Sequence, residues 1–150
     1  MPTIKKILCA VDLSEMSAKI AACAIAMANA FSAELLVLYV APSSVLYSAF
    51  EVQPKGMETF MDELARGAEK QMRKVMDELF SSLPAQGRVL TGYPADEVLG
   101  EAERFGADLI VMGTHGRKGV DLLLFGSVAE KVVKGADVPV LTVNPDCASP

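Results

Sequence analysis

Apolar and polar positions follow two alternating patterns along this 150-residue chain. Several short runs are almost continuously apolar, such as AELLVLYVA at 33–41 and DLIVMG at 108–113. Runs of this kind are typical of strands that are buried on both faces of a parallel sheet. Together with weaker runs of the same type, they predict strands at 4–12, 33–41, 87–92, 108–113 and 138–144.

The segments between these runs have the spacing of amphipathic helices. In the segment 57–83, one face carries apolar residues from Phe60 to Leu79 and the other carries charged residues. Pro94 fits the first turn of a helix and Gly106 fits its end. The predicted helices run from Ser14 or Ser17 to Phe31, over 57–83, over 94–106 and over 127–136, with a long loop at 42–56.

Strands that alternate with helices indicate parallel pairing through right-handed crossovers. The chain is therefore expected to form a single α/β domain over residues 1–150, a three-layer sandwich around a parallel sheet. In such sheets, ligands bind at the carboxyl ends of the strands where the strand order reverses. Asp12 follows the first predicted strand and Gly113 ends the fourth, so both belong to that edge.

Composition and charge narrow the classes of function. The net charge of −5 and a pI near 4.9 argue against general binding of nucleic acid, which usually needs a basic surface. The most membrane-like run, at 21–31, is about half the ~20 residues that a bilayer span requires. Asp12 stands where a signal peptide would have its cleavage region, so we expect a cytoplasmic protein with no membrane partner.

The segment after the fourth predicted strand, GTHGRKGVDLLLFGSVAEKVV from Gly113 to Val133, has two interpretations. It is either a loop of purely structural glycines or a cradle for phosphate. A cradle needs free backbone N–H groups, residues without a Cβ near the anion, and a helix N-terminus. The segment can meet these needs. It has glycines at Gly113 and Gly116, cations at Arg117 and Lys118, and the pair Gly126-Ser127, which would begin the last helix. The Ser127 hydroxyl could cap that helix or bind a phosphate oxygen.

Two familiar phosphate-binding patterns are absent from the sequence. No Gly-Lys-Ser/Thr sequence of a P-loop occurs, and the first predicted strand is followed by VDLSEMS, which lacks the glycines of a dinucleotide fingerprint. The spacing that is present, Gly113, two residues, Gly116, nine residues and Gly126-Ser127, resembles the nucleotide-binding motif of the universal stress protein family. The opening strand and helix and the closing GSVAEKVVKGADVPVLTVN are similar to that family as well.

This resemblance implies a fold, a ligand and a set of binding residues. The family has one branch that binds ATP and one that lacks the glycine motif; this chain has the motif complete. The implied fold is a five-stranded parallel sheet of the adenine nucleotide alpha hydrolase-like (Rossmann-like) type. The implied ligand is ATP or another adenine nucleotide, with Mg2+ accompanying a triphosphate. The implied contacts are Ala10, Val11, Asp12 and Val40 near the base and ribose, Met112 and Gly113 at the ribose, and His115, Gly116, Arg117, Gly126, Ser127 and Val128 along the phosphates.

Leu13 departs from the family, many of whose members have glycine at this position, and its side chain could narrow the site. Asp12 could cap the following helix instead of contacting a ligand. His115, the only histidine, has no second catalytic residue linked to it by a motif, so a contact with phosphate or a structural role fits better than acid–base catalysis. Cys9 and Cys23 fit buried positions, and Asp96 and Glu97 fit the first turn of a helix.

The resemblance also implies a homodimer that pairs through the last strand, Val138–Val143. Our leading interpretation is an ATP-binding stress-response protein whose nucleotide occupancy, or at most slow hydrolysis, signals to a protein partner. The alternative is a nucleotide-free homodimeric interaction module in which the glycine loop is structural. A nucleotidyl-transferring or ATP-hydrolysing enzyme and a flavodoxin-like carrier have less support, because neither a histidine pair nor a hydroxyl-rich loop follows the first strand.

Overall fold

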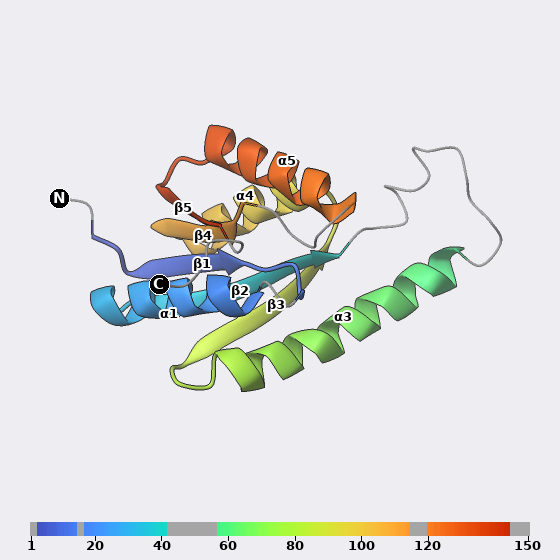
Figure 1. Ribbon diagram of the computed structural model, residues 1–150, viewed down its shortest axis with the longest axis horizontal. Helices are drawn as coiled ribbons and strands as arrows, with labels where there is room; N and C mark the ends of the chain where they lie inside the picture. The colour runs from blue at the N-terminus through green and yellow to red at the C-terminus, as the bar shows by residue number, and fades with distance from the viewer. Residues whose placement is uncertain (1–2, 15–16, 42–56, 115–119, 145–150) are drawn as a thin grey trace.

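A computed structural model describes residues 3–14, 17–41, 57–114 and 120–144. It contains one five-stranded parallel sheet with the strand order β3-β2-β1-β4-β5 (Figure 1). The predicted parallel α/β architecture is therefore confirmed. In chain order the elements are β1 (Lys6–Ala10), α1 (Ser17–Phe31), β2 (Glu34–Ala41), α3 (Met57–Leu79), β3 (Ala85–Thr91), α4 (Pro94–Phe105), β4 (Leu109–Gly113), α5 (Val120–Gly135) and β5 (Val140–Val143).

The sheet is covered by helices on both faces, which explains why its central strands are apolar without alternation. Ile7 and Cys9 of β1 point into a core that α1 and α3 cover, while Leu8 and Ala10 point into a second core under α4 and α5. Figure 1 shows α1 and α3 on one side of the sheet and α4 and α5 on the other. Each residue of β1 from Ile7 onward is therefore buried, as expected for an inner strand.

A glycine allows α3 to pack closely on the edge strand β3. A Cβ built on Gly87 would lie 2.8 Å from Cγ of Met76 and 3.1 Å from Cγ of Met72, which is too close for an undisturbed side chain. Met72 is buried in the core and Met76 is partly buried against it. These two methionines therefore pack against the sheet and do not form an exposed surface.

The ends of α4 agree with the sequence. Pro94 is its first residue, Asp96 and Glu97 lie in the first turn, and Gly106 ends it with φ = 74°. In this left-handed conformation the Gly106 N–H bonds to the carbonyl of Glu103, as glycine at a helix C-terminus commonly does. No helix in the described parts of the chain is long and apolar enough to cross a membrane.

The start of α5 differs from the prediction. The sequence suggested that this helix begins at Gly126-Ser127, but it begins at Val120 and passes through both residues. The residues between, DLLLF, include three leucines, which are good helix formers. A glycine inside a helix costs only about 1 kcal/mol relative to alanine, so one glycine does not end it.

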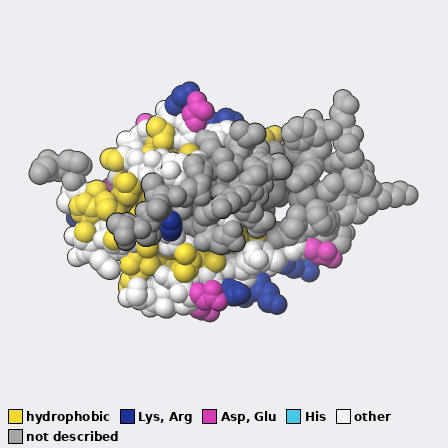
Figure 2. All heavy atoms as spheres, viewed as in Figure 1, with side chains coloured by type: hydrophobic (Ala, Val, Ile, Leu, Met, Phe, Trp, Pro, Cys, Tyr) yellow, Lys and Arg dark blue, Asp and Glu magenta, His cyan; other side chains and the backbone are white. Residues whose placement is uncertain are grey.

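A buried carboxylate on α4 is paired with two arginines. Glu101 on α4 is only 2% exposed, and its carboxylate accepts hydrogen bonds from the guanidinium groups of Arg88 on β3 and Arg104 on α4. The Arg104 bond measures 2.9 Å. On the face shown in Figure 2, the coloured basic and acidic side chains lie beside one another in small groups.

Candidate functional site

The order of the strands creates a topological switch point between β1 and β4. From β1 the chain proceeds to β2 and β3 on one side, then returns to place β4 and β5 on the other side. The connection after β1 therefore leads to one side of the sheet and the connection after β4 leads to the other. Open α/β sheets bind ligands at the carboxyl ends of two such strands. Asp12 follows β1 and Gly113 ends β4, so the sequence correctly predicted that both lie at this edge (Figure 1).

Backbone pairing brings several predicted site residues together. Ala10 is in register with Met112 of β4 and with Leu38 of β2. The Val11 N–H donates to the Leu38 carbonyl at 2.9 Å, which extends the pairing beyond β1. Of the remaining predicted residues on these strands, Gly113 is buried and Val40 is half-buried. The side chains of Ala10, Val11 and Met112 are buried in the two cores, so these residues lie beneath the carboxyl edge of the sheet.

Asp12 is a charged residue at this edge, and hydrogen bonds from two serines fix its carboxylate. Its Oδ1 accepts hydrogen bonds from the Ser14 N–H at 3.0 Å, from the Ser14 hydroxyl at 2.6 Å and from the Ser17 hydroxyl at 3.3 Å. None of these three bonds comes from a backbone N–H of α1, so they do not show the capping of that helix that the sequence left open. Leu13 between them has φ = 61°, the left-handed region, which explains why glycine would fit this position.

Thr114 is a candidate site residue that sequence reasoning missed. It follows Gly113 directly, and its N–H donates to the Val143 carbonyl at 2.9 Å. Its Oγ1 is buried and has no hydrogen-bond partner within the described ranges. Leaving a buried hydroxyl unpaired costs about 1–3 kcal/mol, so this atom is suited to a ligand oxygen. A hydroxyl residue between Gly113 and His115 was the available signal in the sequence.

The phosphate part of the predicted site is only partly described. His115, Gly116 and Arg117 lie outside the described residues. Gly126, Ser127 and Val128 are all within α5, where backbone N–H groups pair with carbonyls of the preceding turn. The idea that Gly126-Ser127 offers the free N–H groups of a helix start is therefore wrong for this conformation. The Ser127 side chain is exposed, and Val128 packs partly against the core under α5.

The Cys9 thiol lies near the end of β1 and keeps its proton at neutral pH. Burial, with a smaller contribution from nearby Cys23, raises the pKa of the Cys9 thiol to about 12. Cys9 is buried as expected, whereas Cys23 is only half-buried. Within the described segments, no three His, Cys, Asp or Glu side chains are grouped so that they could hold a metal ion.

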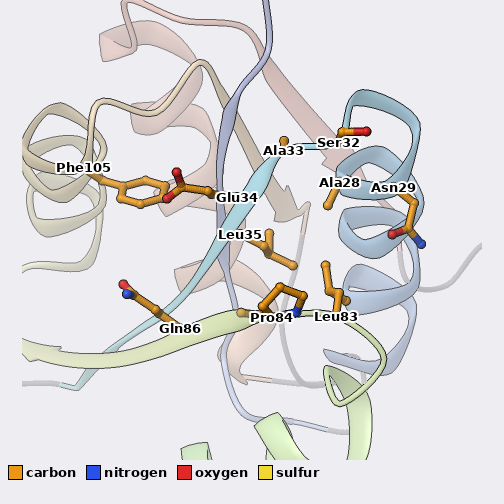
Figure 3. Close-up of a pocket in the computed structure, with 11 residues that line it drawn as sticks. Ala28, Asn29, Ser32, Ala33, Glu34, Leu35, Leu83, Pro84, Gln86 and Phe105 are labelled. Carbon is orange, nitrogen blue, oxygen red and sulfur yellow. The ribbon is translucent and has the colours of Figure 1, made fainter.

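A separate cavity lies at the opposite end of the sheet. It has a volume of about 590 Å³ and opens around the amino ends of β2 and β3 (Figure 3). Leu83 and Pro84, from the α3–β3 connection, line it together with Phe105 at the end of α4. The cavity does not include any of the predicted nucleotide contacts, so it is distinct from the carboxyl edge.

Comparisons with known proteins agree with this architecture. A model of the Universal stress protein family matches residues 3–144. Universal stress protein MJ0531 of Methanocaldococcus jannaschii is 37% identical over 141 residues, which cover 93% of this chain and 82% of that protein.

Solved structures give the same result. Protein MJ0577, also from M. jannaschii, is 29% identical and superposes with a TM-score of 0.72 over 97% of this chain and 99% of its own. Two further structures share the fold. One is a universal stress protein in complex with cAMP, with 20% identity and a TM-score of 0.66 over 96% of this chain and 99% of its own. The other is the universal stress protein from Archaeoglobus fulgidus in complex with dAMP, with 16% identity and a TM-score of 0.64 over 96% of this chain and 100% of its own. The chain belongs to the universal stress protein family.

Proposed function

We propose that the chain binds an adenine nucleotide, ATP in the first instance, at the carboxyl edge between β1 and β4. The observation that carries this proposal is that a carboxylate fixed by hydrogen bonds, Asp12, follows β1 and a buried hydroxyl, Thr114 Oγ1, follows β4, the two strands on either side of the switch point. The cAMP and dAMP complexes of fold relatives support an adenine nucleotide as the class of ligand.

The proposed contacts divide along the length of the nucleotide. Asp12 and the backbone of Val40 lie toward the base and ribose, with Ala10, Val11 and Met112 beneath. The chain from Gly113 through Gly116 and Arg117 follows the phosphates, and Arg117 supplies a cation to them. Gly126, Ser127 and Val128, which the family resemblance implies, border the site on α5 without offering the free N–H groups of a helix start. Mg2+, which usually keeps several waters and binds phosphate oxygens, would accompany a triphosphate.

We further propose that occupancy of the site, with at most slow hydrolysis, is the signal that a partner protein reads in the cytoplasm. The edge strand β5 supports a homodimer, because an edge strand has unpaired backbone groups and Val140, Leu141 and Val143 are only half-buried. A nucleotide-free module that uses this dimer is the second candidate, favoured by the continuous α5 that keeps Gly126-Ser127 inside a helix.

The direct test is to denature the purified protein and identify any released nucleotide by chromatography and mass spectrometry, followed by titration of the emptied protein with ATP and magnesium. Adenine nucleotide near one per chain, or saturable binding in the titration, supports the proposal. The double variant Gly116→Val/Gly126→Val should release no nucleotide on denaturation and should not bind ATP in the titration. Circular dichroism should show that this variant folds. Absence of binding in both assays of the wild-type chain would favour the nucleotide-free module.

A further inference from the structure

The carboxylate of Asp12 has two oxygens in different situations. Oδ1 accepts three hydrogen bonds, from the N–H and hydroxyl of Ser14 and from the hydroxyl of Ser17. Oδ2 has no hydrogen-bond partner among the residues that the structure describes, and the Asp12 side chain is partly exposed. One oxygen is therefore saturated by the protein, while the other is available as an acceptor.

The two serines are themselves fixed by the backbone. Ser17 is the first residue of α1, is only 1% exposed, and its N–H donates to the Ser14 carbonyl at 3.0 Å. The left-handed conformation of Leu13 turns the chain back so that Ser14 reaches Asp12. A buried serine hydroxyl normally finds a partner, and here that partner is the carboxylate at the ligand edge.

We infer that Ser14 and Ser17 are positioning residues, which lock the Asp12 carboxylate so that Oδ2 accepts a hydrogen bond from the bound nucleoside. This inference rests on the proposed nucleotide site. The donor on the ligand is a ribose hydroxyl or the amino group of adenine, since both present N–H or O–H groups to an acceptor. Fixing the carboxylate in advance removes a conformational cost that binding would otherwise include.

A double-mutant cycle on nucleotide affinity tests the inference. The affinity of Mg-ATP is measured by calorimetry for the wild type, Ser17→Ala, Asp12→Ala and the double variant. Loss of a hydrogen bond to a charged group predicts a fall of about 10- to 100-fold for Asp12→Ala. Ser17→Ala should weaken binding by about 3- to 10-fold. In the Asp12→Ala background, Ser17→Ala should have no further effect, because no carboxylate remains to be positioned.

Controls separate positioning from a loss of folding. Ser32→Ala changes an exposed serine between α1 and β2, at the opposite end of the sheet, and should leave affinity unchanged. Ser14→Thr keeps the hydroxyl and should bind better than Ser14→Ala. If Ser17→Ala binds ATP like the wild type, or if its loss is the same with and without Asp12, the inference is overturned while the nucleotide site stands. If the wild type and Ser32→Ala both fail to bind, the proposed function and this inference fall together.

Discussion

A substitution at Gly126 tests where α5 begins, which is the main point on which the structure differs from the sequence prediction. If α5 begins at Val120, Gly126 is its seventh residue and lies in the helix interior. Gly126→Ala should then stabilise the protein, because alanine has the higher helix propensity. If the helix instead began at Gly126-Ser127, alanine would replace a favourable N-terminal residue and stability would fall. The sign of the change therefore distinguishes the two helix starts.

The expected gain is about 1 kcal/mol, equivalent to roughly 2–4 °C in Tm for a chain of this size. Gly67→Ala is a matched control, since Gly67 lies inside α3 and a Cβ there would have no atom within 4 Å. Thermal unfolding by circular dichroism gives both values. A lower Tm for Gly126→Ala, with the Tm of Gly67→Ala raised, would refute a helix that begins at Val120.

Three further predictions concern buried groups. Thr114→Val should keep or raise Tm without nucleotide, because no described residue bonds its buried hydroxyl, and it should weaken ATP binding by about 5-fold or more if the proposed site uses that hydroxyl. A lower Tm would mean that the protein itself uses the hydroxyl. The double variant Arg88→Met/Arg104→Met leaves the buried Glu101 carboxylate without these two partners, so urea unfolding should show a loss of about 3 kcal/mol in the free energy of unfolding. Glu101→Met removes the buried charge itself and should change the free energy of unfolding by about 1 kcal/mol or less. The buried Cys9 thiol keeps its proton in the folded state up to about pH 12, whereas the unfolded chain loses it from about pH 9. The free energy of unfolding is therefore unaffected by this group below about pH 9 and falls as pH rises toward 12. Between pH 8 and 10 the wild type should lose about 1.4 kcal/mol more of its free energy of unfolding than Cys9→Ala.

Much of the fold followed from the sequence because its signals are physically simple. The runs at 33–41 and 108–113 are apolar at every position that a two-sided core requires, and both form inner strands. Pro94 and Gly106 mark α4 because proline lacks an N–H and glycine adopts positive φ without strain. The edge that carries Asp12 and Gly113 follows from the βα alternation and the rule for ligand sites in parallel sheets.

Other features depend on contacts that no local pattern encodes. Leucine has no local preference for φ = 61°, so the turn at Leu13 is a consequence of its packing against the core and of the Asp12–serine hydrogen bonds. The start of α5 depends on a balance between one glycine and three leucines that propensity alone leaves close. Whether a threonine such as Thr114 keeps its hydroxyl unpaired is decided by the neighbouring strands, not by its own residue type.

The central place of β1 also affects how this protein folds during synthesis. β1 ends at Ala10, but its second neighbour, β4, begins only at Leu109, about 100 residues later. At roughly 5–20 residues per second, the ribosome takes about 5–20 s to supply that strand. During this interval one side of this central strand lacks its final partner, and an unpaired strand edge is prone to aggregate. Slow translation between β3 and β4 would therefore be more harmful than the same delay after β4.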